Sequence, residues 1–372
     1  MATARYLSPY RKYRSAVYHC ISRVVDKNFI MGDAECLHFV SLMRKCETFY
    51  GIKILSYCVM SNHFHLLLEV PKEQEVQISD DEFLRRVKAL YSANYYAEVE
   101  QIFYNLLASQ ADDNSRVAAD NFKRQFTSRM NNLGNFMKSL KQRFSSWYNR
   151  KNEREGYLWS ARYISVLVQA GYIARIMSTY IDLNPVRAGI AEKPEDYRWC
   201  SYSAALAGDK RAQRGLSRVL WLKDEMPNSA AENSPWLEEE SRHYWTQGSA
   251  DRYRVLLYAD AEETFKEILN RDGKWVKSQV RKGISREEIE KVAASNGQLS
   301  MASMLRHKVS HFSRGLVIGS QLFLDDVFLQ TKEYFGEKRT SGARKLRSKQ
   351  WSKSPKTIHA MRDIQVEPPP PS

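Results

Sequence analysis

The fold is decided by residues 54–70, which read ILSYCVMSNHFHLLLEV. Apolar and β-branched residues fill both flanks, and Ser61-Asn62 supplies a turn signal between them. This pattern predicts two short antiparallel strands that are joined by a tight turn. Because alternate residues of a strand share a face, we expect His63 and His65 to point to one side and Phe64 to point into the core.

Two imidazoles on one face of a strand form a plausible pair of metal ligands. Taken alone this is a weak signal, because His63 and His65 can simply lie on a solvated face of the strand. Their spacing alone therefore leaves both interpretations open.

The residues before this stretch predict the rest of a sheet. Val17–Val24 has the composition of a first strand. From about Asp33 to Tyr50, apolar residues recur at steps of three and four, which predicts a helix that Gly51 ends. The order strand, helix, strand, strand predicts an α+β fold, with an antiparallel sheet and helices on one face.

The composition points to a polyanionic partner. The chain has 372 residues, a formal net charge of +14 and a pI near 9.4. We find no apolar run long enough to span a bilayer, so we expect no membrane partner. The N-terminus lacks the apolar core of a signal peptide, and the five cysteines have no paired spacing, so we expect reduced thiols in a cytoplasmic protein.

Composition also predicts the domain organisation. We expect a first domain over residues 1–210, with a helical insertion at about 72–130 that serves packing or a dimer contact. Ser79-Asp80-Asp81-Glu82 has the spacing of a capping box at the start of that insertion. A linker (211–250), a mainly helical accessory domain (251–335) and a basic disordered tail (336–372) follow.

The accessory domain offers two interpretations. Ser285-Arg286-Glu287-Glu288 predicts a helix start, and a second helix is expected from Gln321 to Tyr334. The spacing is loose for a helix-turn-helix, so we favour a plain packing domain. In the tail, residues 338–356 hold eight Lys or Arg and no acidic residue.

Residues 131–154 interleave basic and aromatic side chains. The apolar residues recur at steps of three and four, which predicts an amphipathic helix with Lys138, Lys141 and Arg143 on its more polar side. Such a face is often only solvated. Here the net positive charge of the chain favours a face that follows a phosphate backbone.

A further helix is predicted over residues 171–184. Tyr180 and Asn184 are four residues apart and are therefore neighbours on its surface. Pro185 ends the helix just beyond Asn184, because the residue before proline is driven out of the helical region. By themselves these residues favour a structural interpretation, in which Tyr180 is a core aromatic and Asn184 is a C-terminal cap.

Three motifs taken together resemble a known family. They are Asn62-His63-Phe64-His65, the Leu-Trp-x-x-Arg-Tyr stretch at 158–163 and the Tyr-Ile-Asp-Leu-Asn-Pro-Val-Arg-Ala-Gly stretch at 180–189. In this order they resemble the single-tyrosine HUH transposases, in particular the REP-associated tyrosine transposases, over residues 10–210. The resemblance implies a ferredoxin-like (RRM-like) antiparallel sheet.

By position, the resemblance also implies the roles of individual residues. His63 and His65 become metal ligands, Tyr180 becomes the nucleophile, and Asn184 matches a position that completes the metal site. Arg162 lies in the second motif and joins the candidate DNA contacts. Two departures stand out: the long insertion, and Ile164 where many relatives have a basic residue.

The activity implied by the resemblance is that of a metal-dependent DNA transposase or endonuclease. It would cleave and rejoin single-stranded or hairpin DNA through a 5′-phosphotyrosine, with Mg²⁺ or Mn²⁺ as the metal, in the cytoplasm and associated with the nucleoid. The alternative is a non-catalytic nucleic-acid-binding regulator derived from a transposase. The intact set of His63, His65 and Tyr180 argues against loss of catalysis. The recognised hairpin, and whether the protein forms a homodimer, stay open.

Overall fold

A six-stranded sheet forms the centre of the molecule, in the order β2-β3-β1-β4-β7-β8. The computed structural model describes residues 6–73, 76–108, 113–222, 245–259, 264–269, 275–281, 290, 316–336, 339–342 and 359–361. Its strands are β1 (Ala16–Arg23), β2 (Lys53–Met60), β3 (His63–Val70), β4 (Ile164–Val168), β7 (Val317–Gly319) and β8 (His359–Met361). A separate two-stranded sheet consists of β5 (Thr264–Leu269) and β6 (Trp275–Arg281). The fold is therefore mixed α+β.

The first part of the chain folds as its sequence predicts. Helix α1 (Asp33–Tyr50) follows β1, and Gly51 ends it in the left-handed conformation with φ of 67°. Residues other than glycine rarely adopt this backbone conformation, which explains why a glycine stands at this position. Strands β2 and β3 form the expected antiparallel pair, and β1 pairs with β3 on its other side.

The remaining helices pack on the sheet or form the insertion. They are α2 (Asp80–Leu90), α3 (Ala93–Ala108), α4 (Asp113–Thr127), α5 (Leu133–Lys151), α6 (Tyr172–Asp182), α7 (Asn184–Arg187), α8 (Ser201–Leu206), α9 (Lys210–Trp221), α10 (Gln247–Ala259) and α13 (Gln321–Leu329). Short 3-10 turns lie at η1 (Val25–Lys27), η2 (Pro194–Asp196) and η3 (Lys332–Tyr334).

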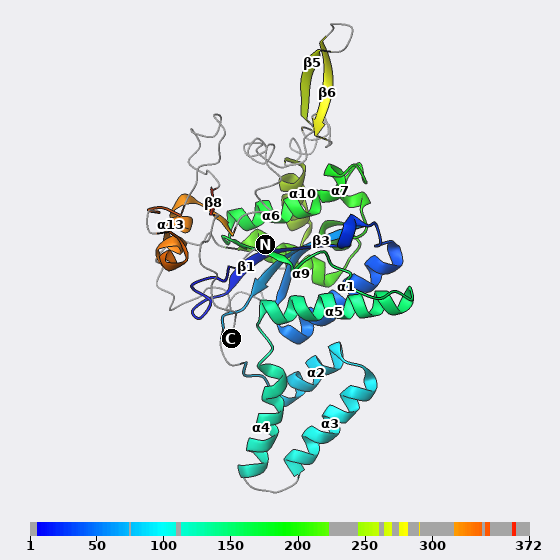
Figure 1. Cartoon of the computed structure of the whole chain (residues 1–372), viewed down its shortest axis with the longest axis vertical. Coiled ribbons are helices and arrows are strands. Elements are labelled where there is room, and N and C mark those ends of the chain that lie inside the picture. Colours follow the sequence, from blue (N-terminus) through cyan, green and yellow to red (C-terminus); the bar gives the residue numbers. More distant parts are fainter. Residues whose placement is uncertain are drawn as a thin grey trace.

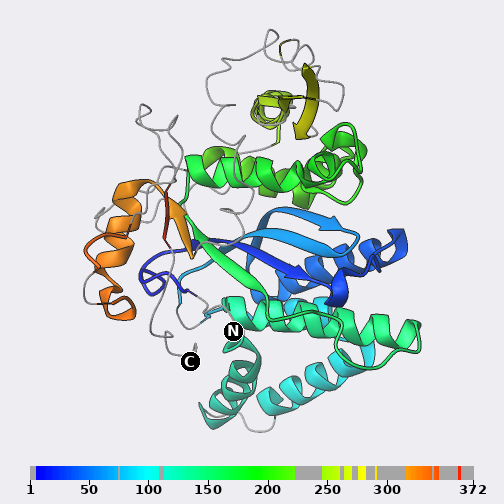
Figure 2. The same ribbon diagram turned by 45° about the horizontal axis from the view of Figure 1, so that its top comes forward.

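Helices cover both faces of the sheet, so the prediction of helices on one face is wrong. Figures 1 and 2 show α1 and α5 on one side and α6 on the other. The strands themselves give the reason. All residues of β2 and β3 except the first of each are buried, and such strands need an apolar layer on both faces.

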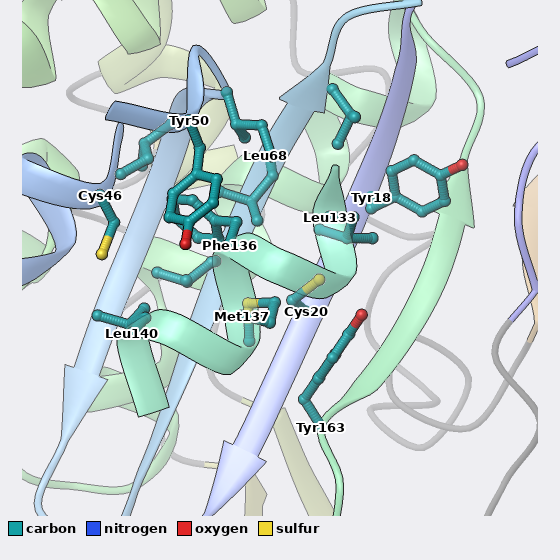
Figure 3. Close-up of a cluster of buried hydrophobic side chains, with 14 of the residues drawn as sticks. Tyr18, Cys20, Cys46, Tyr50, Leu68, Leu133, Phe136, Met137, Leu140 and Tyr163 are labelled. Carbon is teal, nitrogen blue, oxygen red and sulfur yellow. The ribbon is translucent and has the colours of Figure 1, made fainter. Parts of the chain in front are cut away.

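The layer of α1 and α5 forms the larger core. Figure 3 shows Phe136, Met137 and Leu140 of α5 lying over side chains of the sheet that include Cys20 and Leu68. These five side chains are completely buried. They confirm the apolar face that the sequence predicts for this helix.

The layer of α6, α8 and α9 forms the second core, which also includes Leu67 of β3, Met177 and Ile181 of α6, and Leu216 of α9. Helix α9 approaches β2 closely at Gly215. A Cβ atom at this position would lie only 2.5 Å from the carbonyl oxygen of Ile54. The glycine therefore permits the contact between this helix and the sheet.

The insertion contains the helices α2, α3 and α4, which Figure 1 shows below the main body. The predicted capping box is present in part, because the Ser79 hydroxyl accepts a hydrogen bond from the backbone N–H of Glu82 (3.2 Å). Two acidic side chains of this first turn form ion pairs with basic side chains. Glu82 pairs with Arg86 (2.7 Å), and Asp80 pairs with Lys123 of α4 (2.9 Å).

The C-terminal region departs from the prediction of a mainly helical domain over 251–335. It contains the β5–β6 hairpin, and β7 joins the central sheet parallel to β4. Strand β8 lies in the tail that was expected to be disordered, and it pairs with β7. Strands of three residues are too short to show a period of two, so the sequence gives no sign of them.

Several predicted features lie outside the described residues. They are most of the 211–250 linker, the helix expected from Ser285 and most of the basic tail. The first part of that linker is instead occupied by helix α9. Among the described residues, no helix is both long and apolar enough to cross a membrane.

We predict that Gly215→Ala destabilises the fold. The new Cβ would clash with the carbonyl oxygens of Ile54 and Leu55, at 2.5 and 2.7 Å. Relieving this overlap should lower the free energy of unfolding by roughly 1–3 kcal/mol in a urea titration. Gly248→Ala in α10 is the matched control, since its Cβ would meet nothing closer than 3.8 Å. Equal unfolding midpoints for the two variants would contradict the prediction.

Candidate active site

His63 and His65 share one face of β3, as the sequence predicts. Their ring centroids are 5.1 Å apart. Phe64 between them points to the opposite face, where its ring lies 4.6 Å from that of Phe39 in α1. His65 is buried and His63 is half-buried at the end of the strand.

A third histidine, His19 of β1, joins this pair. Its Nε2 lies 2.9 Å from Nδ1 of His65, and the two rings are stacked. His19 is placed diagonally to His65, because Ile21 is the residue directly opposite in the register. The sequence analysis missed His19. The period of two within Val17–Val24 places it on a definite face, but the pairing with β3 was not known.

Helix α6 brings Tyr180 to the same cluster. Its ring centroid lies 5.9 Å from that of His65 and 6.1 Å from that of His19, in edge-to-face geometry. The ring is only 2% exposed. Burial raises the pKa of the Tyr180 hydroxyl, and the nearby charges of Arg187 and Arg23 oppose this rise.

Two arginines that the sequence analysis missed therefore belong to this site. The Arg187 guanidinium lies over the Tyr180 ring, 4.8 Å from its centroid, and its Nη1 donates to the Tyr180 carbonyl oxygen (3.0 Å). Arg23 ends β1 directly opposite His63. Arg187 lies in the 180–189 motif, but the helix was predicted to end at Pro185, so its contact with Tyr180 could not be inferred from helical spacing.

The end of α6 differs in detail from its prediction. The helix ends at Asp182, and Asn184-Pro185 begins the short helix α7 instead of ending α6. The side-chain amide of Asn184 donates to the carbonyl oxygens of Tyr180 (3.0 Å) and Ile181 (3.1 Å). Asn184 thus caps α6, and these bonds leave its Oδ1 atom unused. Proline suits a first helical turn, which explains why it begins a helix here.

The two histidines of β3 have the chemistry of metal ligands. Nδ1–H of His63 donates to Oδ1 of Asn62 (2.6 Å), because an amide oxygen can only accept, and this leaves Nε2 with a lone pair. Nδ1 of His65 is paired with Nε2 of His19, and in the tautomer in which His65 donates this bond, its Nε2 keeps a lone pair as well. Metal-binding histidines commonly have their second nitrogen held in this way.

Both imidazoles are held in the neutral form, which is the form that binds metals. Burial lowers the pKa of His63 to about 4, and the charge of Arg23 adds to this effect. Burial, with the neighbouring histidines, lowers the pKa of His65 well below its usual value. Within the described part of the chain, no three His, Cys, Asp or Glu side chains are placed to hold a metal.

A buried carboxylate ties α6 to the C-terminal part of the chain. Asp182 is completely buried, and its Oδ2 accepts from the Tyr253 hydroxyl of α10 (2.6 Å). Its Oδ1 accepts from the backbone N–H of Tyr202 (3.2 Å), and the Tyr253 hydroxyl also contacts that of Ser178 (2.7 Å). Burial raises the pKa of Asp182 to about 7. Asp182 is the last residue of α6 and lies two residues after Tyr180. Its hydrogen bond with Tyr253 therefore fixes the end of the helix that carries Tyr180.

Three of the four predicted DNA-binding residues lie apart from this cluster. Lys138, Lys141 and Arg143 belong to α5, on the opposite face of the sheet. Lys138 and Arg162 are exposed. Lys141 donates to the Ala161 carbonyl oxygen (2.8 Å). Arg143 is half-buried, and its guanidinium carbon lies 4.9 Å from the centroid of the Tyr91 ring.

Comparison with known proteins gives one family. Residues 12–109 match the model of the family described as Transposase IS200 like. The match confirms the predicted resemblance to a transposase family for this part of the chain. The matched segment holds the two histidines of β3 and ends one residue after α3, before Tyr180.

A solved structure of a REP-associated tyrosine transposase bound to a REP hairpin is a more distant match. It shares 13% identity with this chain, with a TM-score of 0.35, and the alignment covers 63% of this chain and 99% of that one. No curated protein matches in sequence.

We predict that Tyr253→Phe destabilises this transposase-like chain more than Tyr258→Phe does. Both hydroxyls lie on α10 and donate to a carboxylate at 2.6 Å. Asp182 is fully buried, so loss of its donor should cost roughly 1–3 kcal/mol of unfolding free energy. The partner of Tyr258, Glu195, is partly exposed and keeps Arg254 nearby. Tyr258→Phe should therefore lose less unfolding free energy. Denaturant titration measures both, and an equal or larger loss for Tyr258→Phe would contradict the role of Asp182.

Proposed function

We propose that this protein is a metal-dependent DNA transposase or endonuclease that uses Tyr180 as its nucleophile. The observation that carries the proposal is the convergence of His63, His65 and Tyr180 on one face of the sheet. These residues come from segments more than 100 positions apart in the sequence. The family match of residues 12–109 supports a transposase independently of Tyr180.

The first four strands support a ferredoxin-like core as part of this proposal. Their order is β2-β3-β1-β4, all neighbours are antiparallel, and α1 and α5 pack on the same face. In this arrangement β1 and β3 are the two central strands. The central position of His19 and His65 gives the candidate site a rigid base.

A divalent metal would be held by Nε2 of His63 and His65 and by Oδ1 of Asn184. Such a mixed nitrogen and oxygen set suits Mn²⁺ or Mg²⁺, and imidazole favours Mn²⁺. When bound, the metal would neutralise charge on the scissile phosphate and orient it. Asn184 would contribute while its amide nitrogen still caps α6.

The reaction itself would be carried by Tyr180. Its hydroxyl oxygen forms a bond to phosphorus, the bond from phosphorus to the 3′ oxygen breaks, and the phenolic proton is lost as that oxygen gains one. The products are a 5′-phosphotyrosine and a free 3′ hydroxyl, and the reverse reaction rejoins DNA. Arg187 and Arg23 favour the reaction because positive charge stabilises both the phenolate and the phosphate.

The burial of Tyr180 places a requirement on this mechanism. A ring that is 2% exposed cannot meet a DNA phosphate without movement. Arg187 covers the ring, and a phosphate is a stronger partner for a guanidinium than an aromatic face. We therefore infer that DNA binding draws Arg187 away and exposes Tyr180.

The same burial favours a second candidate function. A regulator that binds nucleic acid without cleaving it would keep Tyr180 as a permanent core residue. In that case, the ring would pack in the site and its oxygen would have no chemical role. The two functions differ in whether the wild-type chain cleaves DNA and loses this cleavage when the Tyr180 oxygen alone is removed.

The proposed substrate is single-stranded or hairpin DNA. The exposed Lys138 and Arg162 are proposed backbone contacts, joined by Lys141 and Arg143 only where they can leave their present partners. The net charge of +14 supports such a partner.

We predict that Tyr180→Phe abolishes cleavage of a labelled hairpin oligonucleotide in the presence of Mn²⁺. The phenyl ring still fills the site, so folding and hairpin affinity should be nearly unchanged. His63→Ala should also abolish cleavage, but through loss of Mn²⁺ binding, which Tyr180→Phe should retain. Denaturing electrophoresis measures cleavage, and isothermal titration with Mn²⁺ measures binding.

The control is Tyr163→Phe, which removes another mostly buried hydroxyl of the same chain and should leave cleavage intact. Residual cleavage by Tyr180→Phe in proportion to its folded fraction would make Tyr180 a core residue and not the nucleophile. Absence of cleavage by the wild type as well, with hairpin binding retained, would favour the regulator. Equal Mn²⁺ binding by His63→Ala and wild type would remove His63 from the proposed metal site.

A further inference from the structure

Two unusually exposed aromatic side chains lie in loops at one end of the central sheet. Tyr157 is 90% exposed and Phe29 is 79% exposed, the two highest values among the large apolar side chains of the described residues. One exposed apolar residue on a surface needs no explanation. Two such residues beside the same site do.

Backbone hydrogen bonds place the loop that carries Phe29 beside the start of β3. The first residue of β3, His63, lies opposite Arg23, the last residue of β1. The loop that follows β1 carries Phe29 and returns to the turn between β2 and β3, where Met31 N–H donates to the Ser61 carbonyl oxygen (2.9 Å). Phe29 therefore lies on the β2–β3 side of His63.

A second set of bonds places Tyr157 on the other side of His63. Val25 N–H donates to the Leu158 carbonyl oxygen (3.0 Å), and Val24 forms an isolated bridge with Trp159. The segment that carries Tyr157 thus runs along the extension of β1, away from the β2–β3 turn. The two segments that carry these aromatic residues therefore lie on either side of the start of β3, where His63 is placed.

The charge of this edge is positive. Segments 23–29 and 150–162 together hold six Lys or Arg and three Asp or Glu. Arg23, Lys27 and Arg162 are exposed. Exposed aromatic rings among excess cations are the combination by which proteins bind single-stranded nucleic acid, since the cations follow the phosphates and the rings stack on bases.

We propose that Phe29 and Tyr157 stack on unpaired bases on either side of a phosphate held at His63. This inference rests on the proposed function, because it takes His63 as the position of the scissile phosphate. Bases within a duplex are already stacked on one another and cannot offer their faces to both rings. The pair of aromatics therefore selects a single DNA strand over a duplex.

The test measures binding of the full-length chain, in EDTA, to fluorescent oligothymidylate of about 20 nucleotides and to its duplex with oligoadenylate. Wild type should bind the single strand more tightly. Phe29→Ala and Tyr157→Ala should each weaken this binding roughly five- to a hundredfold while affecting duplex binding little. Phe29→Trp and Tyr157→Trp should restore it, because the indole also stacks.

Tyr104→Ala is the matched control. Tyr104 is a 50% exposed aromatic on α3 of the insertion, away from this edge, and its removal should leave both affinities unchanged. Equal binding of single strand and duplex by wild type would overturn the proposal. So would unchanged single-strand binding in the two alanine variants, or failure of the tryptophan variants to restore it.

The outcome is independent of the nucleophile. Cleavage by Tyr180→Phe would refute the proposed catalytic role and leave the affinities in EDTA as they are. Conversely, unaffected binding by Phe29→Ala and Tyr157→Ala would refute stacking and leave the cleavage results intact.

Discussion

Strand β3 lies between two packed layers, and the candidate site depends on this constraint. Phe64, Leu66 and Leu68 point into one core, while His65 and Leu67 point to the opposite face with His63. A shift of the strand by one residue would exchange these two sets and would place imidazoles in the apolar layer of α1. The same burial that fixes the register keeps the histidines neutral, which is the state that a metal requires.

The second half of the site depends on how α6 is held against that face. Tyr180 packs on His65 and His19, and Asp182 fixes the end of the helix through Tyr253 of α10. Residues from both sides of positions 223–244 therefore act on one helix. The C-terminal part of the chain is thereby connected to the candidate nucleophile, and it also extends the sheet through β7 and β8.

Much of the first domain could be predicted because its signals are local. The period of two in residues 54–70, the period of three to four before Gly51 and the cap at Ser79 each depend on neighbouring residues, and each is present. The shared face of His63 and His65 follows from the same period.

The missed features are contacts between distant segments. His19 needed the pairing of β1 with β3, and the bond between Asp182 and Tyr253 spans 71 positions. The second layer of helices was missed because a fully buried strand was taken as one with a single covered face. Three-residue strands such as β7 carry no periodic signal, so their place in the sheet depends on tertiary contacts alone.

The most direct test of this account is to locate the covalent bond between protein and DNA by peptide mass spectrometry. The chain would be incubated with Mn²⁺ and the hairpin oligonucleotide, digested with trypsin and searched for nucleotide-modified peptides. Our account predicts the modification on the peptide 176–187, in which Tyr180 is the only tyrosine. A modification on Tyr148 or Tyr163 instead would contradict the assignment of Tyr180 as the nucleophile.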